Sequence, residues 1–143
     1  LSTEHGPRGG DEINKIHFKK NYGWPISSYG ESYANDELNY FKSHELKGFE
    51  EPIYSFVPSI GISEIISAGD KFSDKWKDNF LVSSLNDRSL YRIKFDSIYS
   101  KIYYKEKIFV GQRIRDLKFD PELNLILLSL EDKGELGILR IKE

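Results

Sequence analysis

The feature of this sequence that most constrains its fold is a succession of short apolar or alternating segments, each bounded by turn residues. Ser89–Phe95 alternates polar and apolar residues as a half-buried strand should. Leu123–Leu130 is almost wholly apolar and short, with turn residues on both sides, which predicts a strand buried on both faces rather than a helix. The pattern predicts these strands: Ile13–Phe18, Ile53–Val57, Ile62–Ser67, Asn79–Leu85, Ser89–Phe95, Lys101–Val110, Ile114–Phe119, Leu123–Leu130 and Leu136–Lys142.

The predicted strands group into blocks of about four, which is the organisation of β-propeller blades of roughly 40–50 residues. One full blade runs from Ile62 to Val110, and three strands of another run from Ile114 to Lys142. The strands before residue 58 are assigned to a preceding blade. We therefore predict an all-β fold, a partial β-propeller in which residues 1–143 form one arc of a single domain.

The region Tyr29–Glu51 interrupts this pattern, because it is polar, rich in tyrosine and only weakly periodic. We interpret it as a long loop or insertion. A short helical turn is expected near Asn35–Ser43.

The segment Glu4–Pro25, with the sequence EHGPRGGDEINKIHFKKNYGWP, contains residues that suit a loop around a hard cation. Pro7 lacks an N–H group, and the two glycines that follow it permit unusual backbone angles. Asp11 and Glu12 supply carboxylates, and Ca²⁺ prefers carboxylate and carbonyl oxygens. From these residue types alone, an ordinary polar turn between two strands is the simpler explanation, because such turns are common.

The second chemical feature is the sequence Arg113-Ile114-Arg115-Asp116 at the start of a predicted strand. Residues i and i+2 of a strand share a face, so Arg113 and Arg115 are expected to point the same way and Asp116 the other way. Two neighbouring guanidinium groups repel unless an anion or an acid lies between them, and each can hold a carboxylate. The residues themselves leave open a solvated pair with flexible acidic partners.

Composition excludes several classes of function. The 21 Lys and Arg residues and 23 Asp and Glu residues give a net charge of −2 and are scattered along the chain, which argues against a dedicated nucleic-acid or membrane surface. No apolar run approaches the length of a membrane span. Without cysteine there are no disulfides or thiolate metal sites. Because the chain contains no methionine, we expect Leu1 not to be a natural start and the chain to be part of a longer protein.

Several strings, in order along nearly the whole chain, resemble the glucose/sorbosone dehydrogenase family, the soluble sugar dehydrogenases that depend on pyrroloquinoline quinone (PQQ). The strings are EHGPRGGDEIN, NYGWP, GFEEPIYSFVPSIGIS, WKDNFLVSSL, SLYRIKF and RIRDLKFDPELNLILLSLED. The resemblance implies the C-terminal blades of a six-bladed propeller and a Ca²⁺- and PQQ-dependent oxidation of a sugar C–OH group by hydride transfer to the quinone. It also implies a periplasmic or secreted protein, with a sugar substrate and an unknown electron acceptor.

The resemblance assigns roles to individual residues of this chain. Gly6 and Pro7 match the residues whose carbonyls hold the Ca²⁺ that touches PQQ. Glu12 and the backbone of Tyr22 match ligands of a second, structural Ca²⁺. The remaining matches are cofactor contacts: Arg113 and Arg115 for the PQQ carboxylates, and Asn86 where the family has a lysine.

The resemblance also leaves gaps. The family's catalytic base is a histidine in an earlier blade, outside this chain, so we assign no catalytic residue among His5, His17 and His44. Asn86 keeps a hydrogen-bond donor but lacks the lysine's charge, and Val57 stands where the glucose dehydrogenases have an aromatic residue. An alternative is therefore a non-catalytic propeller that binds a glycan or protein partner and keeps Ca²⁺ only as a structural ion.

Overall fold

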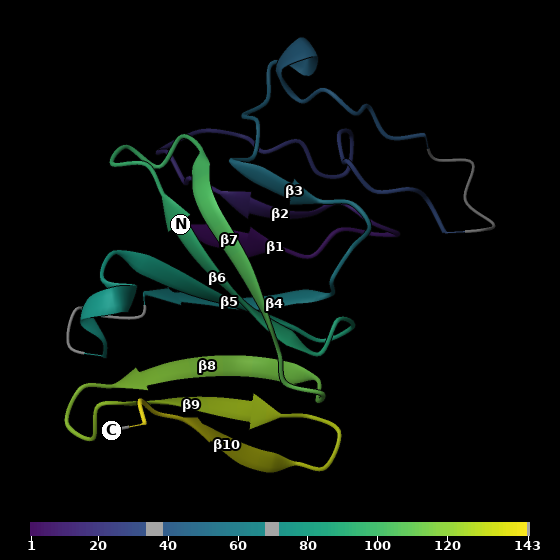
Figure 1. Ribbon diagram of the computed structural model, residues 1–143. Coiled ribbons are helices and arrows are strands. Elements are labelled where there is room, and N and C mark those ends of the chain that lie inside the picture. The colour runs from purple at the N-terminus through teal and green to yellow at the C-terminus, as the bar shows by residue number, and fades with distance from the viewer. Residues whose placement is uncertain (34–38, 68–71, 143) are drawn as a thin grey trace. The chain divides into compact units, whose positions relative to one another are not determined.

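The computed structural model describes residues 1–33, 39–67 and 72–142, and Figure 1 shows their strands in separate sheets. Within these residues there is no α-helix, only two short 3-10 turns, η1 (Glu45–Lys47) and η2 (Asp74–Trp76). The chain divides into two units, Leu1–Ile62 and Ser63–Glu143. The strands are β1 (Ser2–Glu4), β2 (Asp11–Asn14), β3 (Tyr54–Phe56), β4 (Ile62–Ser67), β5 (Asn79–Ser84), β6 (Ser89–Phe95), β7 (Ile102–Phe109), β8 (Ile114–Asp120), β9 (Leu125–Leu130) and β10 (Glu135–Leu139).

The first unit contains a three-stranded sheet in the order β1-β2-β3. The central strand β2 is antiparallel to both neighbours, and all four of its residues are buried. This register places Glu4 of β1 opposite Glu12 of β2. Two acidic side chains are thereby brought together on one sheet.

The second unit contains a four-stranded sheet in the order β4-β5-β6-β7. Its second strand, β5, is almost entirely buried, whereas the edge strand β7 is largely exposed. β7 carries Lys105, Glu106 and Lys107, and charged side chains on an edge strand discourage pairing with another chain. This gradient from buried to exposed strands is expected of a propeller blade.

The second unit also contains the three-stranded sheet β10-β9-β8, whose buried side chains pack with those of the four-stranded sheet. Phe72 lies in this core, with its ring 6.3 Å from that of Phe119 in an edge-to-face arrangement. Close to the start of β8, the Ser63 hydroxyl donates to the Ile114 carbonyl at 2.6 Å, which joins the two sheets. The buried members of this core are Phe72, Leu81, Leu90, Ile114, Leu117, Ile126, Leu128 and Leu130.

The structure confirms the predicted fold class, an all-β chain forming part of a β-propeller. The block from Ile62 to Val110 is one four-stranded sheet, and the block from Ile114 to Lys142 forms three strands. β4 and β6 have the predicted bounds. None of the described helices is long and apolar enough to cross a membrane.

Several boundaries differ from prediction. The strand expected at Ile13–Phe18 begins earlier, at Asp11, and ends at Asn14. The strand expected at Leu123–Leu130 begins at Leu125, because Asn124 adopts a positive φ of 50° in the preceding turn. β9 is buried on one face and partly exposed on the other, so the prediction of burial on both faces was wrong.

The helical turn expected near Asn35–Ser43 lies partly outside the described residues. Among those described, the turn in this region is η1, which begins after His44. Strand β1 was not predicted, because Ser2-Thr3-Glu4 carries no apolar alternation.

Candidate functional site

The loop of the first unit that was predicted to hold a cation is organised around the buried side chain of Asp11, which is 0% exposed. The Gly6 N–H donates to Asp11 Oδ1 at 2.9 Å. The N–H groups of Ile60 and Ile62 donate to Asp11 Oδ2 at 3.0 and 2.8 Å. A single carboxylate thus fixes the Gly6-Pro7 turn to the segment that leads into β4.

The glycines of this loop are required by close backbone contacts. A Cβ on Gly6 would lie 2.4 Å from the Gly9 carbonyl oxygen, and one on Gly10 would lie 2.2 Å from the Gly30 nitrogen. Gly10 also has a φ of +69°, which L side chains rarely adopt. The backbone that includes the predicted Gly6 and Pro7 ligands is therefore held in one tight arrangement.

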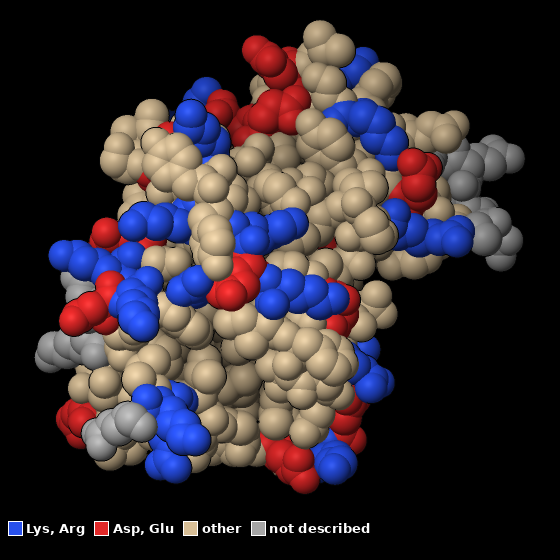
Figure 2. Space-filling model, in the orientation of Figure 1, with Lys and Arg blue, Asp and Glu red and all other residues tan. Residues whose placement is uncertain are grey.

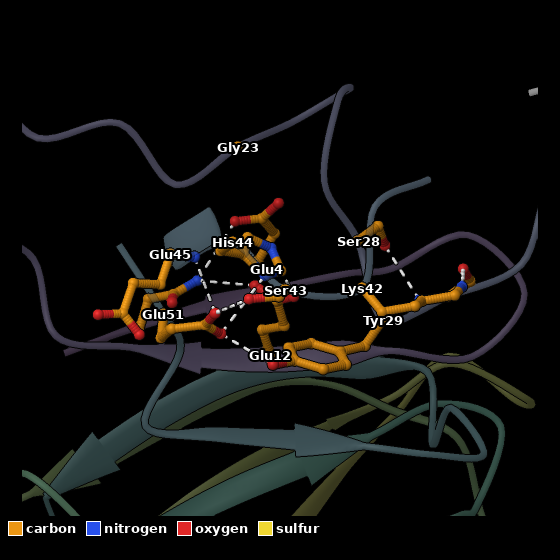
Figure 3. Close-up of polar contacts among 12 residues, drawn as sticks. Glu4, Glu12, Gly23, Ser28, Tyr29, Lys42, Ser43, His44, Glu45 and Glu51 are labelled. Atoms are coloured by element: carbon orange, nitrogen blue, oxygen red, sulfur yellow. Dashed lines mark hydrogen bonds and ion pairs between the residues drawn. The ribbon is translucent and has the colours of Figure 1, made fainter. Parts of the chain in front are cut away.

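The predicted ligand Glu12 is buried beside a second acid, Glu4 (Figure 3). Its side chain is 3% exposed, and burial raises its pKa to about 7, with the Glu4 carboxylate adding to the effect. Asn14 Nδ2 donates to Glu12 Oε2 and to Glu4 Oε2, both at 3.3 Å. The amide oxygen of Asn14 is buried and has no hydrogen-bond partner among the residues that the structure describes. This arrangement concentrates oxygen atoms without a matching positive charge.

His44, from the region interpreted as a polar loop, lies beside Glu12 and is only 1% exposed. Its Nε2 is 3.5 Å from Glu12 Oε1, and its Nδ1 is 3.6 Å from Glu51 Oε2. Neither ring nitrogen makes a hydrogen bond to a described residue. Burial lowers the pKa of His44, so the imidazole does not supply the missing charge at neutral pH.

Tyr29 and Glu51 complete this cluster, and both lie close enough to Glu12 to interact with its charge. The Tyr29 hydroxyl donates to Glu51 Oε2 at 2.8 Å, and its ring lies 5.2 Å from the His44 ring. Burial, with the Glu51 carboxylate nearby, raises the pKa of Tyr29 to about 12. The hydroxyl therefore stays protonated and serves as a donor.

These residues fit a bound Ca²⁺ by the chemistry of their donors, because a hard cation would compensate the buried Glu12 carboxylate and use the unpaired Asn14 oxygen. The described residues contain no set of three or more His, Asp or Glu side chains placed to hold a metal by themselves. Backbone carbonyls would have to contribute. The Tyr22 backbone is a candidate, because the next residue, Gly23, packs against His44. A Cβ on Gly23 would lie 2.9 Å from His44 Cδ2.

The Tyr22 side chain has a separate role. Its hydroxyl donates to the Lys15 carbonyl at 2.8 Å and accepts from the His17 N–H at 2.7 Å. These bonds fix the turn that leads to the Tyr22 backbone.

In the second unit, the structure brings Arg113 and Arg115 to one carboxylate. Arg113 Nε lies 3.2 Å from Glu131 Oε2, and Arg115 Nη2 lies 2.9 Å from Glu131 Oε1. The side chains of Arg113 and Arg115 are 38% and 55% exposed. The pair therefore holds a carboxylate and still has N–H donors available, which fits a ligand that carries carboxylate groups.

The backbone around this pair departs from the regular alternation of a β-strand. The register of β8 against β9 shifts between Ile114 and Asp116, and both Arg115 and Asp116 are exposed. The inference that Asp116 points to the opposite face relied on alternation that this bulge interrupts. Asp116 Oδ1 accepts from the Leu117 N–H at 2.8 Å instead of pairing with an arginine.

Asn86 lies exposed in the turn between β5 and β6. The Ser63 hydroxyl bonds both Ser83 near the end of β5 and the Ile114 carbonyl at the start of β8, so the turn that follows β5 lies at the same end of the two sheets as the start of β8. Among the described residues, no hydrogen bond joins Asn86 to Arg113 or Arg115. On the face of the molecule drawn in Figure 2, cationic and acidic side chains are interspersed.

Sequence reasoning missed the contributions of Glu4, Asn14, His44 and Glu51 to the acidic cluster and that of Glu131 to the arginine pair. The signal for Asn14 was present, because it shares a strand face with Glu12 at a spacing of two. The others depend on strand register and on the path of a loop.

Comparison with known proteins agrees with this architecture. The family model described as Glucose / Sorbosone dehydrogenase matches residues 1–140. The chain is 34% identical over 137 residues to the aldose sugar dehydrogenase YliI of Escherichia coli (strain K12), covering 94% of this chain and 36% of that protein. It is 32% identical over 136 residues to the uncharacterized protein slr1608 of Synechocystis sp. (strain ATCC 27184 / PCC 6803 / Kazusa), covering 94% of this chain and 32% of that protein.

Solved structures give the same result. A crystal structure of a glucose dehydrogenase superimposes with a TM-score of 0.81 at 29% identity, covering 99% of this chain and 40% of that one. The soluble aldose sugar dehydrogenase from Escherichia coli in its apo-form gives a TM-score of 0.78 at 28% identity, covering 97% and 40%. The chain thus spans well under half the length of the proteins it matches.

Proposed function

This chain belongs to the glucose/sorbosone dehydrogenase family, and from that premise we propose that the protein containing it oxidises a sugar C–OH group with PQQ and Ca²⁺. PQQ, when bound, would accept the hydride. Gly6 and Pro7 would present backbone oxygens to a Ca²⁺ ion, with Asp11 holding their turn in place. Glu12 and the Tyr22 backbone would hold a second Ca²⁺. On the same family resemblance we propose a periplasmic or secreted location.

The observation that carries the cofactor assignment is the convergence of Arg113 and Arg115 on one carboxylate. It supports binding of a small molecule with carboxylate groups, as PQQ has, because both guanidiniums retain further N–H donors. Asn86 would add a neutral donor at the same end of the sheets. The proton of the sugar hydroxyl must be taken by a residue outside this chain, as we assign no base within it.

The proposal is tested by titrating PQQ into the full-length protein in the presence of Ca²⁺. Arg115→Ala should cost about 1.5–3 kcal/mol of PQQ affinity, the range for a hydrogen bond to a charged group. Lys118→Ala removes another exposed cation from the same strand and serves as the matched control. Equal PQQ affinities for the wild type and both variants would show that the arginine pair does not bind PQQ.

A non-catalytic propeller is the second candidate, and Asn86 is the observation that favours it. An exposed asparagine at this position contributes no positive charge toward an anionic cofactor. In that case the full-length protein binds Ca²⁺ through the Glu12 cluster and a glycan or protein partner elsewhere, but shows no PQQ binding. The same titration separates the two candidates.

A further inference from the structure

The carboxylate that joins the two arginines comes from a residue with a fixed place in the sheet. Glu131 directly follows β9, and its backbone N–H donates to the Arg113 carbonyl at 2.9 Å. The Arg113 N–H in turn donates to Asp132 Oδ2 at 3.2 Å. The Glu131 side chain therefore starts from a backbone position tied to the strand that carries the arginines.

Each oxygen of Glu131 takes one arginine, Oε2 from Arg113 Nε and Oε1 from Arg115 Nη2. Two guanidiniums this close to one carboxylate would otherwise repel each other and separate into solvent. The hydrogen bond from Arg115 lowers the pKa of Glu131, which keeps the carboxylate charged. The contact uses the Nε side of Arg113, so its terminal N–H groups stay available.

We infer that Glu131 is a positioning residue that aligns Arg113 and Arg115 for a carboxylate of the bound cofactor. This inference rests on the proposed function. Glu131 reduces the net charge of the pair, yet it holds both guanidiniums in one place before the ligand arrives, so less side-chain freedom is lost on binding. The ligand uses the remaining N–H donors and does not displace Glu131.

The test is a calorimetric titration of PQQ into the full-length protein in the presence of Ca²⁺. The melting temperature is measured on each sample. Glu131→Gln should weaken PQQ binding about two- to fivefold, the range expected for exposed ion pairs, at an unchanged melting temperature. Glu131→Asp, which keeps the charge on a shorter side chain, should recover part of the affinity. Glu122→Gln is the matched control, because it removes an exposed acid from the β8–β9 turn, at the opposite end of the sheet.

A double variant shows whether Glu131 acts through the arginines. In an Arg115→Ala background, Glu131→Gln should produce a smaller further loss than it does alone, because one of the two side chains it aligns is gone. If Glu131→Gln leaves the affinity unchanged, or raises it as expected for a competing carboxylate, the inference is wrong. If Arg115→Ala itself has no effect, the proposed function fails instead, so the two failures are distinguishable.

Discussion

Replacing Glu12 by glutamine should stabilise the protein in the absence of Ca²⁺, and Ca²⁺ should remove most of that advantage. Burial raises the pKa of Glu12 from 4.5 to about 7 in the folded, metal-free protein. Between these pH values the unfolded chain releases a proton that the folded protein retains, so the contribution of Glu12 to stability is lost as pH rises. At 1.36 kcal/mol for each pKa unit, the free energy of unfolding falls by about 3 kcal/mol. This loss is complete above pH 7.

Glutamine fits the same space and cannot ionise, so it avoids this cost. At pH 8 in a chelator, Glu12→Gln in the full-length protein should therefore be more stable than the wild type, by up to about 3 kcal/mol. At pH 4 the two should be nearly equal. With Ca²⁺ at 100 times its dissociation constant, the wild type gains about 2.7 kcal/mol by mass action, and the variant gains much less.

The assay is urea unfolding at pH 4 and pH 8, the pH 8 series being run with chelator and with Ca²⁺. Glu122→Gln is the control, because replacing this exposed acid should leave the stability unchanged with or without Ca²⁺. If Ca²⁺ stabilises the wild type and Glu12→Gln equally, Glu12 is not a ligand. If the variant is less stable than the wild type at pH 8 in chelator, the burial argument is refuted.

Two further predictions concern the loop that carries Gly6 and Pro7. Asp11→Asn should lower the stability of the full-length protein by about 2–4 kcal/mol in chemical unfolding, since the amide cannot accept all three backbone hydrogen bonds; a loss no larger than that of the exposed Asp74→Asn would contradict this role. Gly10→Ala should lower the melting temperature and weaken Ca²⁺ binding measured by calorimetry, because its Cβ would lie 2.2 Å from the Gly30 nitrogen; wild-type values for both would show that the loop can move aside.

Strands with a clear apolar pattern between turn residues were predictable from the sequence. β4 and β6 have the predicted bounds because alternation and flanking turns specify them locally. β1 was missed, since Ser2-Thr3-Glu4 becomes a strand only by pairing with β2. Local patterns carry no information about such pairing.

The candidate site was predictable to a similar extent. The spacing of Arg113 and Arg115 predicts that they act together, and both do contact one carboxylate. Glu131 became visible as their partner only once the register of β8 and β9 was known. His44 lies in a polar stretch that gives no sign of burial, and its place beside Glu12 depends on the path of the whole loop.

The central claim is tested most directly by sugar-dependent reduction of an electron-accepting dye by the full-length protein. The protein would be freed of metal with a chelator and then supplied with PQQ, Ca²⁺, both or neither. The account predicts reduction with aldoses only when PQQ and Ca²⁺ are both present, and a lower rate for Arg115→Ala at subsaturating PQQ. Binding of Ca²⁺ without any sugar-dependent reduction under these conditions would contradict it and favour the non-catalytic propeller.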